Sequence, residues 1–409
     1  MKYLVSLFSL FILFFGFQAS VKAQGNQPPK RLMLHPENRN AVKDQYIIVL
    51  TEEAFKPIHK TANFSRLKTR EARLKALQNH QRIFGPVVRE ILESAGIPEN
   101  KVLKIFTGRS SGFVAKLTQV QLKKLLNFKT IWWIEQDLIL KFPIQSGTIK
   151  PFNTQETDWG VAAVGSANGA EKCAFVLDTG VDLDHEDLNV NRTLSTSFVS
   201  AEPSANDRNG HGTHCAGIIG AIDNNKGVKG VAAGATIVSV KVLNRNGDGY
   251  FSDCALAVLY AAAVGLPRDV INLSLSGAGN FFTLGWNLKF VVQPAGLFTA
   301  IAAGNDDAHA KDYMPARVNG IKIYTVSNHD SNNDITTSSN YGNGPVDYAA
   351  PGQSILSCDL NNTYSRRSGT SMAAPHVAGI LLINNGVIRS RGKVNTDKDS
   401  NKDTMASLN

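Results

Sequence analysis

The sequence predicts an α/β fold: a three-layer α/β/α domain with a mostly parallel central sheet, preceded by a small α+β domain. From about residue 155 onward, strand-like apolar runs alternate with helical runs, which favours a parallel sheet covered on both faces. Residues 24–150 carry 22 Lys and Arg against 10 Asp and Glu, whereas residues 151–409 carry 19 against 24. A basic segment therefore precedes an acidic one, and the two should attract each other.

The composition excludes several classes of protein. The chain has 409 residues, of which 43% are hydrophobic and 19% charged. These values are typical of a globular protein and not of a disordered, collagen-like or multi-span membrane protein. The chain has a net charge of +9, but the excess of positive charge lies in residues 24–150, so it does not indicate nucleic acid as a partner. We expect a monomer.

Residues 1–23 have the layout of a secretory signal peptide. Lys2 precedes an apolar run from Leu4 to Phe17, and Val21 and Ala23 are small residues suited to a cut after Ala23. The alternative is an uncleaved membrane anchor, but the run is shorter than the ~20 residues needed to span a bilayer. We therefore expect a secreted product, extracellular or periplasmic, with no membrane partner.

Four cysteines lie in the acidic segment, at positions 173, 215, 254 and 358. Secretion permits disulfides, and the three full pairings that four cysteines allow remain open, as does the alternative that some thiols stay free. No pair has the close spacing of a zinc or redox site.

The first domain, residues 43–142, mixes strands and helices. Two helical stretches follow the first strand and are separated by a break at Gly85-Pro86, and a third, short helix is capped by Thr118. The predicted strands are Gln45–Leu50, Val102–Phe106, Gly112–Lys116 and Trp132–Glu135, and the predicted helices are Phe64–His80, Arg82–Ser94 and Thr118–Leu126. Residues 143–154 have the composition of an exposed linker, a natural site for cutting.

The second domain, residues 155–409, supplies the parallel sheet. Its predicted strands are Cys173–Leu177, Thr236–Val242, Val270–Leu275, Leu297–Ala302 and Ile321–Val326, and its helices include His211–Ile219 and Asp253–Val264. Ligands of such sheets collect at the carboxyl ends of the strands. We therefore looked for polar residues that follow the apolar runs.

Four places carry side chains suited to acyl transfer. Asp178 ends a strand, His211 starts a small-residue helix, and Ser371 stands at the head of an apolar helix that contains Pro375, which we expect near its first turn. Asn305 ends another strand with an amide donor. An imidazole can take the proton of a serine hydroxyl while a carboxylate holds the imidazole, and an amide can stabilise an oxyanion.

Each of these residues alone has a simpler interpretation. A strand-end Asp is often a turn former, a His among small residues is often packed structurally, and a Ser before an apolar run is often an N-cap. Their joint occurrence at the ends of elements of one predicted sheet favours catalysis.

The motifs DTGVD, NGHGTHCAG, AAGN and GTSMAAPHVAG resemble those of the subtilisin-like serine proteases, in that family's order. The resemblance implies Asp178 as the triad carboxylate, His211 as the general base, Ser371 as the nucleophile and Asn305 as the oxyanion donor. It implies structural roles for His214 and His376, and Cys215 resembles the thiol of the proteinase-K-like branch. The alternative is a catalytically silent, secreted peptide-binding protein on the same scaffold.

The amino-terminal domain is similar to the inhibitory propeptide of this family. The resemblance rests on YIIVL at Tyr46–Leu50, GFVAKL at Gly112–Leu117 and IEQD at Ile134–Asp137. It implies a zymogen whose propeptide assists folding, is cut off within residues 142–154 and then acts as a transient inhibitor.

The resemblance also implies where a substrate peptide binds. Protein and peptide substrates would add as a strand between two edges, Gly247, Asp248 and Gly249 on one side and Ser274, Leu275, Ser276 and Gly277 on the other. We further hypothesise that Asp306 and Asp307 favour a basic residue before the cut, and that Arg366 and Arg367 favour acidic residues after it.

No cofactor is expected for catalysis, but the resemblance implies a structural calcium ion. Oxygen ligands drawn from separate loops suit Ca²⁺. The counterparts in this chain are the side chains of Gln155, Asp187 and Asn224 and the backbone carbonyls of Ile222, Lys226 and Val228. The acidic stretch Asp397–Asp403 lacks a glycine and a closing carboxylate, so it is better interpreted as a solvated polar tail.

Overall fold

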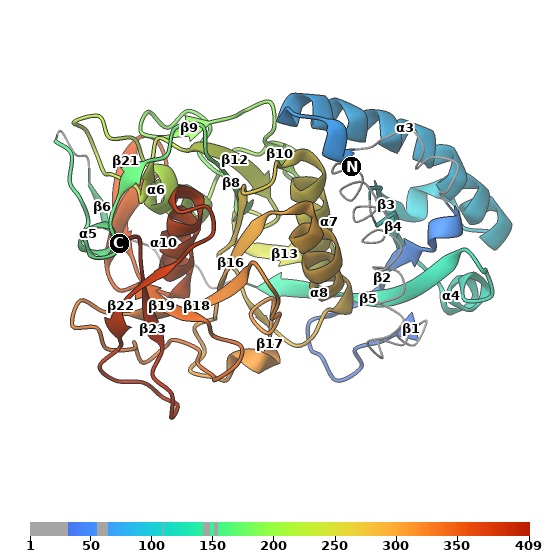
Figure 1. Ribbon diagram of the computed structural model, residues 1–409. Helices are drawn as coiled ribbons and strands as arrows, with labels where there is room; N and C mark the ends of the chain where they lie inside the picture. Colours follow the sequence, from blue (N-terminus) through green and yellow to red (C-terminus); the bar gives the residue numbers. More distant parts are fainter. Residues whose placement is uncertain (1–31, 55–63, 109, 142–147, 151–153) are drawn as a thin grey trace, which may run out of the picture.

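The computed structural model describes residues 32–54, 64–108, 110–141, 148–150 and 154–409 (Figure 1). The expected signal peptide and most of the expected linker lie outside these residues. No helix among the described residues is long and apolar enough to cross a membrane.

The amino-terminal domain is a sheet covered on one face by helices, at the right of Figure 1. The strand order is β1-β5-β2-β4-β3, with β13 of the second domain added beside β5. The strands are β1 (Leu32–Met33), β2 (Ala41–Leu50), β3 (Val102–Phe106), β4 (Gly112–Lys116) and β5 (Ile131–Lys141), and the helices are α3 (Arg70–Ala95) and α4 (Gln119–Leu125), with short 3-10 turns η1 (Glu52–Ala54), η2 (Phe64–Arg66) and η3 (Glu99–Lys101).

The predicted break at Gly85-Pro86 is wrong, because α3 continues through Pro86 to Ala95. A proline inside a helix costs roughly 3 kcal/mol. Phe84 and Val88, on either side of it, are both fully buried in the core of this domain. Their burial keeps the helix in one piece. The helix also begins later than predicted, at Arg70, where the Thr69 side chain caps it.

A 10-stranded sheet forms the centre of the second domain, in the order β10-β12-β8-β14-β16-β18-β19-β23-β22 with β9 beside β12. The pairs are parallel except for β22 with β23. The strands are β8 (Cys173–Asp178), β9 (Asn189–Val190), β10 (Thr196–Ser197), β12 (Thr236–Lys241), β14 (Val270–Leu273), β16 (Phe298–Ala302), β18 (Ile323–His329), β19 (Tyr348–Pro351), β22 (Arg389–Lys393) and β23 (Thr404–Ser407).

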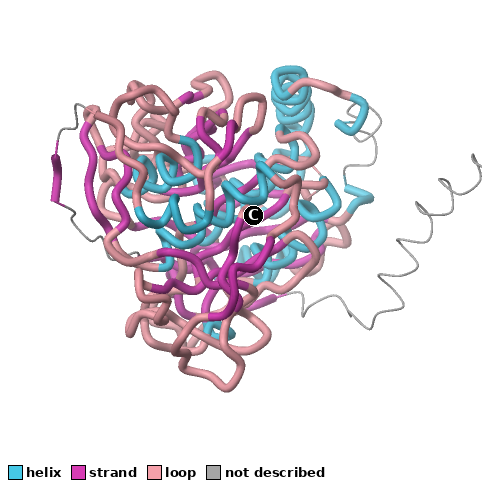
Figure 2. The backbone as a smooth tube through the Cα atoms, turned by 60° about the vertical axis from the view of Figure 1, so that its left-hand side comes forward, coloured by secondary structure: helices cyan, strands magenta, loops and turns pink. Residues whose placement is uncertain are grey.

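Helices cover both faces of this sheet, as Figures 1 and 2 show. Phe175 of β8 packs in the core cluster that contains α7, whereas its neighbour Val176 packs in the cluster that contains α6 and α10. The alternation of side chains along a strand thus builds a layer on each face. The helices are α5 (Trp159–Val164), α6 (His211–Gly220), α7 (Phe251–Val264), α8 (Phe282–Asn287), α9 (Gln293–Ala295) and α10 (Thr370–Ile383), with a π-helical turn η4 (Leu288–Val292) and a 3-10 turn η5 (Ala310–Asp312).

Short strands complete the second domain at its edges. They are β6 (Thr148–Lys150), β7 (Ala167–Asn168), β11 (Ala232–Ala233), β13 (Asp248–Tyr250), β15 (Gly277–Ala278), β17 (Tyr313–Met314), β20 (Ile355–Asp359) and β21 (Thr363–Arg367). Figure 1 shows the parallel sheet between α7 on one side and α6 and α10 on the other, which is the predicted three-layer fold.

The two domains share a core. Alternate residues of β2 face in opposite directions: Ile48 packs under the helices of its own domain, whereas Ile47 joins the core cluster of the second domain. Ion pairs also join the two domains. Nε and Nη2 of Arg70 donate to the Asp269 carboxylate at 2.8 and 2.5 Å, and Lys104 pairs with Asp253. The predicted attraction between the basic and acidic segments thus corresponds to specific ion pairs.

All four cysteines are free and buried. Burial raises the pKa of the Cys215 thiol well above its ordinary value, so this thiol stays protonated and is a poor nucleophile.

Candidate active site

Asp178 and His211 meet at the carboxyl end of β8. The Nδ1 atom of His211 lies 2.8 Å from Oδ1 of Asp178, and both side chains are buried. This approach requires Gly212, because a Cβ there would lie 2.0 Å from the carbonyl oxygen of Gly180. The glycines of the two motifs therefore allow α6 to start against the end of the strand.

Ser371 lies beside this pair, in the first turn of α10. Its hydroxyl donates to the carbonyl oxygen of Ser274 at 3.1 Å. Its own carbonyl oxygen accepts hydrogen bonds from the Cys215 thiol at 3.4 Å and from the Ser274 hydroxyl at 2.8 Å. Since Cys215 lies one turn after His211 on α6, its contact with Ser371 links the start of α10 to the helix that carries the imidazole.

Pro375 explains why the Ser371 carbonyl needs those partners. Proline has no N–H, so the carbonyl four residues earlier has no helical donor. We expected Pro375 near the first turn of α10, but it is the sixth residue of that helix. The thiol of Cys215 and the hydroxyl of Ser274 replace the missing donor.

Asn305 lies against the start of α10. Its Oδ1 accepts hydrogen bonds from the N–H of Thr370 at 2.9 Å and from the Thr370 hydroxyl at 3.1 Å. Because the backbone N–H is an unambiguous donor, the amide oxygen is fixed on Thr370 and the Nδ2 group is left for another acceptor. A second asparagine, Asn340, holds the loop after Asn305 through the N–H groups of Asp306 and Ala308.

The other two motif histidines are buried and bond to backbone. Nε2 of His214 lies 3.0 Å from the Ser365 carbonyl oxygen, and Nδ1 of His376 lies 2.8 Å from that of Met372. Burial lowers the pKa of His214 well below its ordinary value and that of His376 to about 4. Both rings are therefore neutral near neutral pH.

The expected substrate edges flank this site, and one of them is covered by the amino-terminal domain. Strand β13 pairs antiparallel with the end of β5, Asp248 opposite Lys141 and Gly249 opposite Leu140. Gly247 directly precedes β13. A Cβ on Gly277 would lie 2.7 Å from a methyl carbon of Leu140, so Leu140 reaches the second edge. The chain's own strand thus lies where a substrate strand is expected.

The second edge continues from Ser274 to Gly277. Leu275 is fully buried, and Ser276 lies close to Gly304, where a Cβ would be 3.0 Å from the Ser276 hydroxyl oxygen. These residues connect the Ser371 contact to β15.

Two carboxylates of β5 bind the starts of two helices of the second domain. Glu135 accepts from the N–H groups of Phe282 and Thr283 at 2.6 and 2.8 Å, at the start of α8. Asp137 accepts from the N–H of Ser252 at 3.0 Å, at the start of α7. In the sequence, Glu135 and Asp137 belong only to a motif that resembles the family's propeptide. Their binding to the starts of α8 and α7 could not be predicted, because it depends on how the two domains dock.

The expected calcium ligands lie around one loop. Nδ2 of Asn224 donates to Oδ1 of Asp187 at 2.9 Å, and Nε2 of Gln155 donates to the Ile222 carbonyl oxygen at 2.9 Å. The N–H of Val228 bonds to the other oxygen of Asp187 at 3.0 Å. Burial raises the pKa of Asp187. A carboxylate, two side-chain amides and a backbone carbonyl are ligand types that suit Ca²⁺, but in this structure the amide nitrogens of Gln155 and Asn224 and the N–H of Val228 donate to the Ile222 and Asp187 oxygens.

The ammonium group of Lys226 points away from the expected calcium ligands. Its ammonium group lies 3.4 Å from the Glu186 carboxylate, on exposed side chains, and only its backbone belongs to the expected ligand set.

The substrate hypotheses for three other charged residues lose support. Arg367 is buried and pairs with Asp359 at 3.0 Å, and Arg366 pairs with Asp158 and Glu156, each at 3.0 Å. Asp307 contacts the ammonium group of Lys398, whereas the hypothesis for Asp306 stays a prediction. These charges are used within the protein, which sequence patterns alone do not reveal.

Comparisons with known proteins agree with this fold and geometry. Residues 175–386 match the Subtilase family, and residues 45–143 match the peptidase inhibitor I9 family. The chain is 35% identical over 303 residues to the alkaline serine exoprotease A of Vibrio alginolyticus, a match that covers 71% of this chain and 54% of that relative.

Two further matches cover a larger share of the matched protein. The chain is 35% identical over 276 residues to the thermostable alkaline protease of Halalkalibacterium halodurans, covering 66% of this chain and 71% of the relative. A solved structure described as a cold adapted subtilisin-like serine proteinase matches with a TM-score of 0.51 and 34% identity, covering 60% of this chain and 90% of that one.

The fold and the site therefore place the chain in the class of serine endopeptidases. An inhibitor-type domain precedes the protease domain. The chain belongs to the subtilase family. The resemblance drawn from the sequence motifs is confirmed, as is the predicted fold class.

Proposed function

We propose that the chain is the zymogen of a secreted, monomeric serine endopeptidase that hydrolyses peptide bonds in proteins through an acyl-enzyme on Ser371. The observation that carries this proposal is the 2.8 Å contact between Asp178 and His211 beside the serine at the head of α10. In this proposal Nε2 of His211 takes the proton of the Ser371 hydroxyl, and Asp178 stabilises the resulting imidazolium.

Two donors would stabilise the oxyanion that forms on the substrate carbonyl. The fixed orientation of the Asn305 amide leaves its Nδ2 group as one donor. The N–H of Ser371, in the first turn of α10, has no helical acceptor within reach and supplies the second. Collapse of the intermediate breaks the peptide bond, and His211 returns its proton to the leaving amine.

The amino-terminal domain, residues 43–142, would act as an intramolecular inhibitor. Its end, Ile139–Lys141, pairs with β13 at the edge where a substrate strand is expected. We propose that the protease cuts itself within residues 142–154, and that the separated amino-terminal domain stays bound to the protease until it is degraded.

A calcium ion would be held by Gln155, Asp187 and Asn224 and by the carbonyls of Ile222, Lys226 and Val228. It would balance the charge of the Asp187 carboxylate, and it would tie the start of the protease domain to that loop. It takes no part in the chemical steps.

The experiment is active-site labelling of the native chain with a fluorophosphonate, followed by peptide mass analysis and by casein hydrolysis. The proposal expects one label, on Ser371, and loss of hydrolysis in proportion to labelling. Asp178→Asn should lower kcat about 10⁴-fold, since the wrong imidazole tautomer is then favoured. A folded native protein that neither takes the label nor hydrolyses casein would leave the alternative, a peptide-binding protein without activity.

A further inference from the structure

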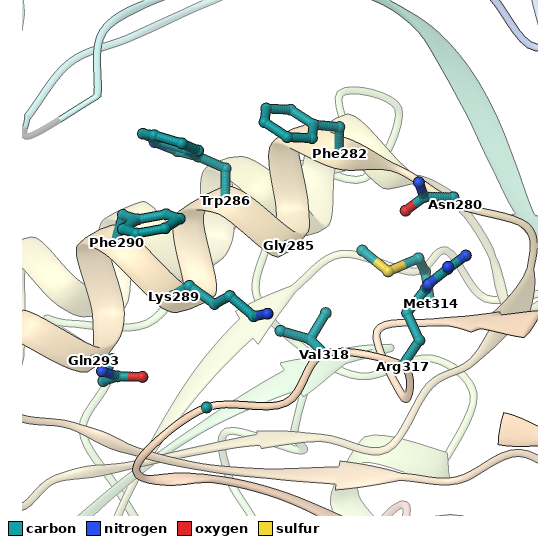
Figure 3. Close-up of a pocket in the computed structure, with 11 residues that line it drawn as sticks. Asn280, Phe282, Gly285, Trp286, Lys289, Phe290, Gln293, Met314, Arg317 and Val318 are labelled. Carbon is teal, nitrogen blue, oxygen red and sulfur yellow. The ribbon is translucent and has the colours of Figure 1, made fainter. Parts of the chain in front are cut away.

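The helix that runs from α8 into η4 carries an aromatic face on the protease domain. Phe282, Trp286 and Phe290 follow one another at intervals of four residues and lie along one side of the helix (Figure 3). The ring centroids are 5.8 Å apart for Phe282 and Trp286 and 4.2 Å apart for Trp286 and Phe290. We call these three residues the aromatic face.

In this chain two adjacent tryptophans of β5 cover the aromatic face. The ring of Trp132 lies 5.0 Å from that of Trp286, and the ring of Trp133 lies 5.4 Å from that of Phe282. Trp133 is fully buried, and its Nε1 donates to the Thr283 hydroxyl at 2.9 Å. The segment that binds the face is therefore two aromatic residues followed closely by the carboxylate of Glu135.

The same strand leads directly into the substrate cleft. Residues Ile139–Lys141 pair with β13, six positions after Trp133. An extended chain covers about 3.3 Å per residue, so roughly 20 Å separate the two contacts. A polypeptide bound at β13 and extended toward its own amino terminus can therefore reach the aromatic face.

An open pocket of about 470 Å³ adjoins the aromatic face (Figure 3). Besides the three rings, its lining includes Lys289 and Arg317, both exposed. A positive rim beside aromatic rings favours a segment that carries carboxylates as well as apolar side chains. The β5 segment that packs on the aromatic face has this composition, but no β5 residue lines the pocket itself, and the carboxylates of Glu135 and Asp137 bind backbone N–H groups of α8 and α7.

We propose that, after the amino-terminal domain has left, the aromatic face is an exosite for protein substrates. It recognises an extended segment, upstream of the bond to be cut, in which aromatic residues are followed by acidic ones. The inference rests on the proposed endopeptidase function and deepens it, because it adds a determinant of substrate choice outside the cleft. Departure of the amino-terminal domain would otherwise leave Phe282 and Trp286 facing water.

The test compares two peptides as competitors of a short chromogenic substrate that occupies only the cleft. One peptide is residues 131–150 of this chain, and the other is the same peptide with Trp132→Ala and Trp133→Ala. Each is titrated against the processed protease in its native form and as Trp286→Ala. Two aromatic pairs predict that the native peptide competes about tenfold more strongly than its variant with native protease. With Trp286→Ala this preference should fall to a small factor, because only the contacts of Trp133 with Phe282 and Thr283 remain.

Two further variants and the short substrate separate the possible failures. Trp286→Phe should restore most of the preference, and Trp159→Ala, a tryptophan of α5 outside this face, should leave it intact. Hydrolysis of the short substrate should be the same in all variants. If native protease cuts the short substrate but binds both peptides equally, the exosite is overturned. If it does not cut the short substrate, the proposed endopeptidase function fails instead.

Discussion

At the residue scale, the candidate site depends on a carbonyl that lacks its helical partner. Pro375 removes the donor for the Ser371 carbonyl oxygen, and Ser274 and Cys215 supply hydrogen bonds instead. Pro375 and Cys215 were visible in the sequence motifs, but their connection was not, because it requires α6 and α10 to pack side by side. The cysteine's place beside the imidazole thus has a structural reason that does not involve thiol chemistry.

Ser274→Ala should destabilise the protein by about 1–3 kcal/mol, because it leaves a buried carbonyl with only the weak thiol donor. Cys215→Ala should cost less, since a thiol is a weaker donor than a hydroxyl. Urea unfolding of both variants in a Ser371→Ala background, where self-digestion cannot interfere, measures the difference. A larger loss for Cys215→Ala than for Ser274→Ala would contradict this order.

At the scale of the element, strand ends were predictable and domain contacts were not. Asp178 and Asn305 could be proposed because they follow apolar strands, and His211 and Ser371 because they begin small or apolar helices, and both positions carry a local signal. Glu135 and Trp133 gave no such signal, since their partners are contributed by another domain. The break predicted in α3 failed for a related reason: local proline chemistry was outweighed by the burial of Phe84 and Val88.

The hairpin of β22 and β23 carries a pH-sensitive carboxylate. Asp403 accepts from the Ser327 hydroxyl at 2.5 Å, and burial, with further contributions from Asp397, Asp399 and Asp347, raises its pKa to about 7. The folded protein therefore holds this proton more tightly than the unfolded chain does. Between about pH 4 and 7 the contribution of Asp403 to stability falls as pH rises, because the unfolded state binds fewer protons.

Asp403→Asn should consequently stabilise the protein more at pH 8 than at pH 5. The amide keeps an acceptor for Ser327 and removes the buried charge that forms at high pH. Thermal unfolding of the variant and its parent at both pH values, again with Ser371→Ala, gives the difference directly. A gain that is equal at both pH values, or larger at pH 5, would show that Asp403 is not the titrating group.

At the scale of the whole molecule, two domains of opposite charge share one core, and a strand of the first pairs with β13 of the second, at the proposed substrate edge. The charge asymmetry was apparent from composition, and the linker at residues 143–154 stays a prediction. The register of β5 against β13 was not, because it is set by side chains on both domains. That register places the amino-terminal domain over the cleft and over the aromatic face together.

The proposed calcium site should contribute to the stability of the processed protease. If Ca²⁺ is present at 100 times its Kd, its removal costs about 2.7 kcal/mol. A chelator should therefore lower the Tm of the native protease, and Asp187→Asn should lower the Tm and abolish the chelator effect. Glu186→Gln, which removes the adjacent exposed carboxylate, should respond to the chelator as the native protein does. An unchanged native Tm would argue against the site.

The most direct measurement of the central claim is to produce residues 24–409 in native form and as Ser371→Ala, and to follow chain size over time. We predict that the native chain separates into two fragments with a cut within residues 142–154, while the variant remains one intact, folded chain. Cutting at the same place in purified Ser371→Ala, or a folded native chain that stays whole, would contradict the assignment of Ser371 as the nucleophile of a self-processing protease.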